Sequence, residues 1–116
     1  MVYSGKLYSL SCEACSADSQ PVDPDLAKQL LLEIPEWELV SQDGVDVLSR
    51  QFSFDNFREA FMFATRVADI AEQENHHPLL QVEWGRVTVR WWTHRIDGLH
   101  MNDFIMAART DRLSMP

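Results

Sequence analysis

The sequence of 116 residues has little positive charge, few cysteines and no long apolar run. Its 10 Lys and Arg residues are outnumbered by 18 Asp and Glu residues, which gives a net charge of −8, and no basic cluster is present. Binding to nucleic acid needs clustered Lys and Arg against the phosphates, so we expect no nucleic-acid partner. A membrane-spanning helix needs about 20 consecutive apolar residues. No segment approaches that length, so we expect no membrane partner.

The N-terminal segment also lacks the apolar stretch of a secretory signal, which predicts a cytoplasmic protein. In that compartment the two cysteines, Cys12 and Cys15, are expected to be unbridged thiols. Their C-x-x-C spacing also occurs in zinc and redox sites. A zinc site usually needs a second pair of ligands, and a redox pair usually lies at a helix start after a strand. The sequence shows neither pattern, so thiols on a peripheral arm are expected, with zinc and redox roles as open alternatives.

What the sequence does contain is enough apolar content, 46%, for one domain with one hydrophobic core. Residues 1–22 show no sustained periodicity and predict an extended arm, whereas residues 23–116 predict a single domain. The domain begins with a helix, because Asp23 is a good N-cap and Pro24 suits the first helical position. Pro35 is expected to end this helix.

The next segment predicts a β-hairpin. Asp43-Gly44 is a strong signal for a two-residue turn, and strands are expected at residues 37–40 and 45–54. Val47 and Leu48 are adjacent and cannot share one face of a strand. They indicate either a bulge or a stretch that is covered on both faces.

A long amphipathic helix follows, with Asp55 as its expected cap and Pro78 as its expected end. A last helix is expected at residues 102–111, after a break at Gly98. The core stripe of the long helix is predicted from the i, i+3, i+4, i+7 spacing: Phe57, Ala60, Phe61, Ala64, Val67, Ala68 and Ala71.

A second hairpin is expected between these two helices, with Gly85-Arg86 as its two-residue loop. Extended along the strands, the resulting register places His77 opposite His94. The order helix, hairpin, helix, hairpin, helix predicts a two-layer α+β fold, with three helices on one face of a four-stranded antiparallel sheet. The expected loop sets a register with three apolar pairs on one face: Trp84 with Val87, Val82 with Val89, and Leu80 with Trp91.

The clearest functional signal is a group of three histidines, His76, His77 and His94. Imidazole changes its charge near neutral pH, so clustered histidines suit proton transfer. Glu72 lies four residues before His76, where it is expected to contact and orient that ring. Two alternatives stay open: the adjacent histidines cap the helix C-terminus, or the three histidines bind zinc. His100 lies outside the group and is expected to be structural.

The sequence from about Val22 to Arg112 resembles the pterin-4a-carbinolamine dehydratase family. The C-x-x-C arm and the Trp-Trp-Thr-His segment resemble the bacterial branch that accompanies phenylalanine hydroxylase. The residues that carry the resemblance, at these spacings, are Glu72, His76-His77-Pro78, Trp84, Thr93-His94 and Asp103, with Trp37 and Phe52-x-Phe54-x-x-Phe57 in addition.

The resemblance implies dehydration of 4a-hydroxytetrahydrobiopterin to a quinonoid dihydropterin, without metal or organic cofactor. This reaction recycles the tetrahydropterin of an aromatic amino-acid hydroxylase. Implied partners are phenylalanine hydroxylase and further copies of the chain, in a homo-dimer or homo-tetramer. Animal relatives also bind a transcription factor, so a protein-binding regulatory module is the alternative function. The implied acid–base residues are His76, His77 and His94, and the implied substrate-binding residues are Glu72, Asn75, Trp92, Thr93, Arg95, Asp103 and Trp37.

Two positions depart from the family pattern. Asn75 stands where some relatives have Asp, which removes one charge beside the histidine pair. His100 stands where many relatives have Ser or Thr as a helix cap that Asp103 completes. Because histidine is a poorer cap, Asp103 is expected to bind helix-start amides or a neighbouring side chain instead.

Overall fold

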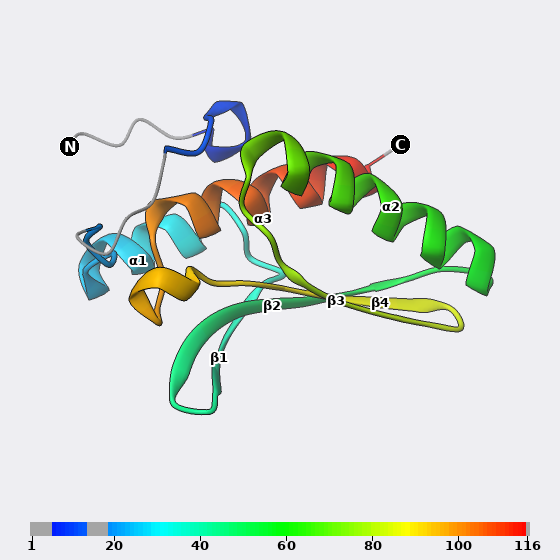
Figure 1. The fold of residues 1–116 in the computed structure, drawn as a ribbon, viewed down its shortest axis with the longest axis horizontal. Helices are drawn as coiled ribbons and strands as arrows, with labels where there is room; N and C mark the ends of the chain where they lie inside the picture. The colour runs from blue at the N-terminus through cyan, green and yellow to red at the C-terminus, as the bar shows by residue number, and fades with distance from the viewer. Residues whose placement is uncertain (1–5, 14–18, 116) are drawn as a thin grey trace.

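The computed structural model describes residues 6–13 and 19–115 of the chain. Figure 1 shows two layers, with helices above and a sheet below, so the predicted α+β fold is confirmed. The predicted order of helices and hairpins is also confirmed. The elements are η1 (Leu7–Ser9), α1 (Pro24–Leu31), β1 (Glu38–Gln42), β2 (Val45–Ser53), α2 (Phe57–Glu74), β3 (Leu79–Glu83), β4 (Arg86–Trp91), η2 (His94–Ile96) and α3 (Met101–Ser114).

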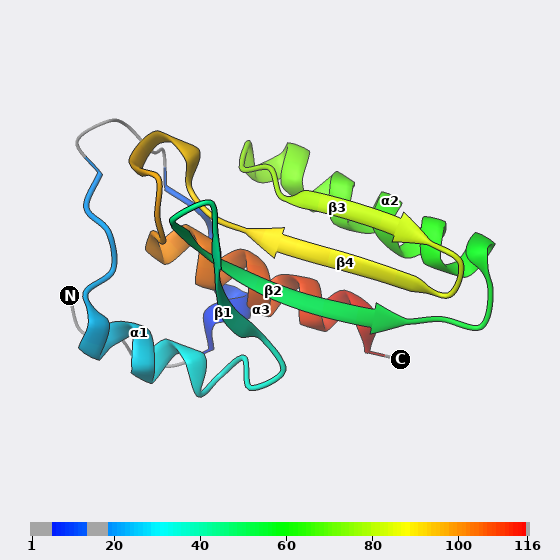
Figure 2. The ribbon, with the colours of Figure 1, turned by 90° about the horizontal axis from the view of Figure 1, so that it is seen from below.

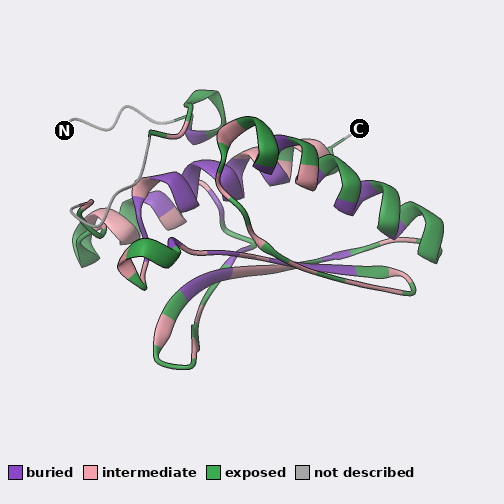
Figure 3. Ribbon diagram, in the orientation of Figure 1, coloured by how far each residue is buried: buried purple, intermediate pink, exposed green. Residues whose placement is uncertain are grey.

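The sheet is antiparallel with the strand order β1-β2-β4-β3, which makes β2 and β4 the central strands. Seen from below in Figure 2, α2 and α3 lie along one face of the sheet, and α1 lies at the end next to β1. Figure 3 shows that burial concentrates where α3 and α2 face the strands. Among the described residues, no helix is long and apolar enough to cross a membrane.

The first helix begins where the sequence predicts and ends earlier. The Asp23 carboxylate accepts a hydrogen bond from the Leu26 amide at 2.9 Å, and Pro24 is the first helical residue. The helix ends at Leu31 rather than at Pro35. Beyond it, the Glu33 and Ile34 amides bond three residues back. This tighter turn suits a segment before proline, because proline disfavours the α conformation of the residue that precedes it.

The first hairpin forms as predicted. Its turn residues Asp43 and Gly44 both have positive φ, 53° and 81°, and Gln42 pairs with Val45 across them. Val47 and Leu48 are both fully buried, and the register of β1 with β2 is unbroken. This stretch is therefore covered on both faces and contains no bulge.

The long helix α2 differs from the prediction in its cap and in part of its stripe. Its N-cap is Asn56, not Asp55, and the Asn56 side chain accepts a hydrogen bond from the Glu59 amide at 2.8 Å. Phe57 and Phe61 were expected in the core, but they are 49% and 56% exposed. Two neighbouring stripes of apolar residues on this helix fit the helical period, and only one of them is buried. The buried stripe consists of Ala60, Phe63, Ala64, Val67, Ile70 and Ala71.

The second hairpin has a different register from the predicted one. Glu83 pairs with Arg86, so the loop is Trp84-Gly85 rather than Gly85-Arg86. A shift of two residues leaves every side chain on its face, so Leu80 still lies over the core, opposite Val89 instead of Trp91. Trp84, however, lies in the loop and is 73% exposed.

Gly85 explains this register. It has φ of 72°, which disfavours residues with a side chain, and a Cβ at this position would lie 3.1 Å from the Phe54 carbonyl oxygen. The Phe54 amide also donates to the Gly85 carbonyl at 2.8 Å. The loop is therefore held against the end of β2. Because β3 starts at Leu79 and β4 ends at Trp91, the predicted pairing of His77 with His94 is wrong.

We expect Gly85→Ala to destabilise the protein more than Gly44→Ala. Both glycines have positive φ, which costs an alanine about 1 kcal/mol, but only Gly85 lies against a backbone atom, whereas nothing lies within 4 Å of a Cβ at Gly44. The free energy of unfolding in urea should fall by about 1 kcal/mol for Gly44→Ala and by about 2 kcal/mol or more for Gly85→Ala. Equal losses would show that the close contact with Phe54 has no energetic weight.

Candidate functional site

The end of α2 positions the two adjacent histidines. The helix ends at Glu74, and Asn75 adopts the left-handed conformation with φ of 50°. The His76 amide then donates to the Ala71 carbonyl at 3.0 Å and closes the helix end. Asparagine tolerates this conformation better than most residues. The helix therefore stops at Asn75 and not at Pro78, and both histidines lie on the extended segment that leads into β3.

His76 faces the interior. Its side chain is 10% exposed, and its ring stacks on Trp91 with centroids 5.7 Å apart and planes 7° apart. Its Nε2 atom lies 2.6 Å from Oδ1 of Asp103. The expected partner was Glu72, one helical turn earlier. That expectation was wrong because the chain leaves the helix at Asn75, before it reaches His76.

Asp103 is fully buried, and its carboxylate has polar contacts with three residues. Its Oδ2 atom accepts hydrogen bonds from the Thr93 hydroxyl and the His100 amide, each at 2.8 Å. Its Oδ1 atom binds His76. A buried carboxylate is tolerated when its oxygens are hydrogen-bonded in this way. Asp103 thus binds both a helix-start amide and neighbouring side chains.

His100 has the structural role expected of it. It is the N-cap of α3, and its Nδ1 atom accepts a hydrogen bond from the Asn102 amide at 3.0 Å. Together with Asp103 it forms a capping box. Histidine can therefore replace Ser or Thr here, because its ring nitrogen reaches the same helix-start amide.

His77 and His94 are more open to solvent. The Nε2 atom of His77 contacts the Glu72 carboxylate, and the two side chains are 54% and 74% exposed. Glu72 thus meets the second histidine of the pair rather than the first. His94 begins η2 and packs against Trp92, with ring centroids 4.5 Å apart.

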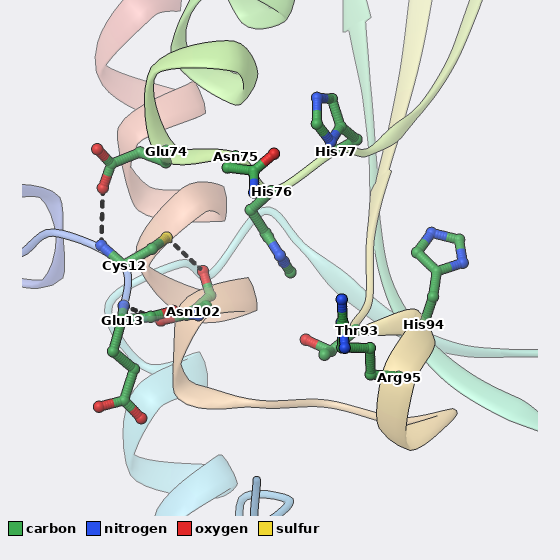
Figure 4. Close-up of a pocket in the computed structure, with 10 residues that line it drawn as sticks. All are labelled: Cys12, Glu13, Glu74, Asn75, His76, His77, Thr93, His94, Arg95 and Asn102. Carbon is green, nitrogen blue, oxygen red and sulfur yellow. Dashed lines mark hydrogen bonds between the residues drawn. The ribbon is translucent and has the colours of Figure 1, made fainter. Parts of the chain in front are cut away.

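These groups surround a cavity of about 370 Å³, shown in Figure 4. Six of the ten predicted site residues line it: Asn75, His76, His77, Thr93, His94 and Arg95. Glu72, Trp92 and Asp103 contact lining residues from behind. Trp37 lies elsewhere, in the core, where its Nε1 atom donates to Asp111 at 2.7 Å.

Four residues that line the cavity were missed by the sequence reasoning: Cys12, Glu13, Glu74 and Asn102. Cys12 and Glu13 belong to the arm, so Cys12 is not peripheral as expected. Cys15 lies outside the described residues. The arm has neither periodicity nor a motif that would reveal its docking site, so only the C-x-x-C spacing marked it as unusual.

The zinc alternative at the histidines required the three imidazoles to converge. Within residues 6–13 and 19–115, no three His, Cys, Asp or Glu side chains come together in a way that could hold a metal ion. The cavity instead places three imidazoles around a space of small-molecule size.

Comparisons with known proteins agree on one family. Residues 20–113 match the family model described as Pterin 4 alpha carbinolamine dehydratase. Two relatives are described as candidate pterin-4-alpha-carbinolamine dehydratases. The one from Marinobacter nauticus is 57% identical over 89% of this chain and 93% of its own length. The one from Chlorobium luteolum is 55% identical over 94% of this chain and 96% of its own length.

A solved structure shows the same fold. The transcriptional coactivator/pterin dehydratase from Brucella melitensis superposes with a TM-score of 0.74 at 27% identity, over 83% of this chain and 100% of that chain.

We expect Asp103→Asn to lower the free energy of unfolding by about 1–3 kcal/mol, because the new NH2 group cannot accept the hydrogen bonds that a carboxylate oxygen accepts at this buried position. Urea denaturation measures the loss. Asp97→Asn, an exposed position with φ of 47° that asparagine tolerates, is the matched control and should stay within about 0.5 kcal/mol of wild type. Equal free energies of unfolding for the two variants would show that the buried carboxylate does not stabilise the fold.

Proposed function

Because this chain belongs to the Pterin 4 alpha carbinolamine dehydratase family, we propose that it removes water from a 4a-hydroxytetrahydrobiopterin to give a quinonoid dihydropterin. The observation that carries the proposal is the cavity lined by His76, His77 and His94, three imidazoles from two separate segments of the chain. This arrangement suits a reaction that needs one group to accept a proton and another to donate one.

The proposed reaction breaks two bonds of the pterin. A base removes the proton from N5, and the electrons of that N–H bond form the N5=C4a double bond. The C4a–O bond breaks at the same time, and an acid protonates the departing hydroxyl group, which leaves as water. No electrons are gained or lost overall, so the proposed step requires no redox cofactor.

The contacts of His76 support its assignment as an acid–base group. The Asp103 carboxylate already accepts hydrogen bonds from Thr93 and His100, and it can also accept one from Nε2 of His76. A proton on Nε2 leaves Nδ1 of the neutral ring as the nitrogen that can accept the substrate proton. Stacking on Trp91 further restricts the ring.

His77 and His94 complete the proposed acid–base set. Glu72 orients His77 as Asp103 orients His76, but at a solvent-exposed position. His94 comes from η2, together with Thr93 and Arg95, which we propose as substrate-binding residues along with Asn75. Glu72, Trp92 and Asp103 would position the residues that touch the substrate.

The proposed biological role is recycling of the tetrahydropterin of an aromatic amino-acid hydroxylase, with phenylalanine hydroxylase as a partner in the cytoplasm. What supports it is the proposed substrate, which is a 4a-hydroxylated pterin. Trp37 stays a substrate-binding prediction without support from its position, because the cavity lies elsewhere.

The alternative function is that of a protein-binding module, and one surface favours it. Phe57 and Phe61 lie on α2 with ring centroids 6.1 Å apart and are about half exposed. Adjacent exposed aromatic rings are typical of protein interfaces. The relative from Brucella melitensis carries both descriptions, coactivator and dehydratase. We propose that this α2 surface holds copies of the chain together in a homo-dimer or homo-tetramer.

We expect His76→Ala, His77→Ala and His94→Ala each to lower kcat for carbinolamine dehydration by about 100-fold, the usual weight of one acid–base group. Stopped-flow absorbance of the pterin follows the reaction. Gln73→Ala, an exposed neighbour on α2, is the control and should keep wild-type kcat. Wild-type rates for all three histidine variants would refute the proposed mechanism.

We expect Phe61→Asp to lower the molar mass of the oligomer measured by light scattering, because a charge is costly to bury at the centre of an apolar contact between copies of the chain. Arg66→Asp introduces the same residue on the opposite flank of α2 and should leave the mass unchanged. An unchanged mass for Phe61→Asp would place the interface elsewhere.

A further inference from the structure

The segment of the arm at residues 6–13 reaches the cavity mainly through main-chain contacts, and the Glu13 carboxylate also lies 3.1 Å from Nε2 of His100. Glu74 accepts a hydrogen bond from the Cys12 amide at 2.7 Å, and Arg109 holds the same carboxylate oxygen at 3.3 Å. Asn102 binds Glu13 twice: its side chain accepts from the Glu13 amide at 3.0 Å and donates to the Glu13 carbonyl at 2.7 Å. Two backbone groups of one residue are thus satisfied by one side chain.

The other end of the arm is also held to the folded domain. The Leu7 side chain is fully buried, and its amide donates to Glu33 at 3.1 Å. The Arg112 guanidinium lies 4.3 Å from the ring centroid of Tyr8. A segment attached at both of its ends is a fixed part of the cavity wall.

The position of the arm completes the cavity. Figure 4 shows Cys12 and Glu13 on one side and Thr93, His94 and Arg95 on the other, with the His76-His77 segment between and above them. The arm therefore lines the side of the cavity that lies opposite His94. Enclosure of most of the ligand surface is what gives small-molecule sites their affinity.

Asn102 links the arm to the histidines. It precedes Asp103 in the first turn of α3, and only 1% of its surface is exposed. One residue of this turn binds the arm, and the next binds His76. The first turn of α3 therefore contacts both the arm and the imidazole.

We propose that Cys12 and Glu13 form a wall that positions the substrate against the histidines, and that Asn102 is the positioning residue that holds this wall. The inference rests on the proposed function, since it takes the occupant of the cavity to be a pterin. The wall contributes to substrate binding and takes no part in proton transfer. Its loss raises KM and leaves kcat nearly unchanged.

A series at Asn102 tests the hydrogen bonds. Asn102→Asp keeps the acceptor for the Glu13 amide but loses the donor, and Asn102→Leu loses both at similar volume. We expect KM for the carbinolamine to rise about threefold for Asn102→Asp and about tenfold for Asn102→Leu, with kcat within about twofold of wild type. A dissociation constant for biopterin, measured by calorimetry, should rise in the same order.

A second pair of variants tests the wall directly and does not depend on whether Asn102→Leu folds. Cys12→Trp places a large ring into the cavity and should raise KM and the biopterin dissociation constant about tenfold. Ser11→Trp makes the same addition one residue earlier, at an exposed position outside the cavity lining, and should change neither.

The results separate the two proposals. A wild-type protein that neither dehydrates the carbinolamine nor binds biopterin would refute the proposed function. An active wild type with unchanged KM in Asn102→Asp and Cys12→Trp would leave that function standing and overturn the wall. A fall in kcat without a rise in KM would also overturn it, because the arm would then act on the chemical step.

Discussion

The buried carboxylate of Asp103 is the constraint on which the site depends. Three donors from three segments meet on its two oxygens: the His76 ring after α2, the Thr93 hydroxyl before η2 and the His100 amide before α3. A carboxylate in such a place is stable only while these donors stay. The segments that carry the histidines are consequently held together by this carboxylate in addition to the packing of His76 on Trp91. This explains how a pocket forms at the ends of elements, where chains are usually less ordered.

The first turn of α3 therefore has two functions at once. As a helix start it needs acceptors for its amides, and His100 and Asp103 supply them in a capping box. As the floor of a cavity it fixes His76 through Asp103 and the arm through Asn102. Burial on nearly every side of this turn leaves little room for either side chain to move. Local helix energetics and the geometry of the pocket thus depend on the same atoms.

Much of the fold could be predicted from short-range signals, because caps, turns and alternation act within a few residues. Asp23-Pro24 and Asp43-Gly44 are examples, and both formed as expected. The register of the second hairpin could not be predicted in this way, since Gly85 contacts Phe54, which lies just after β2 and 31 residues earlier in the chain. The buried stripe of α2 was ambiguous for a similar reason: a stripe with Phe57 and a stripe with Phe63 both fit the helical period, and contact with the sheet decides between them.

In the candidate site, too, short-range features could be predicted and contacts between distant residues could not. The histidines could be found from their residue type and spacing, but their carboxylate partners could not. Asp103 is 27 residues from His76. Glu72 contacts His77 instead of the predicted His76, because the helix ends before His76 and Asn75 is its C-cap. The arm left no sequence signal for its position at the cavity, because the amides of Cys12 and Glu13 make much of the contact there, and every residue except proline carries such a group.

That mode of docking has a consequence for how the pocket can change over time. Glu33, Glu74 and Asn102 recognise peptide groups, so the arm residues between Tyr8 and Glu13 can be exchanged without loss of these hydrogen bonds. The histidines have no such freedom, since each is held through its own ring. The cavity thus has histidines whose side chains are fixed by their contacts and an arm whose side chains can be exchanged. Substitutions in the arm can therefore change which ligand binds without changing the histidines.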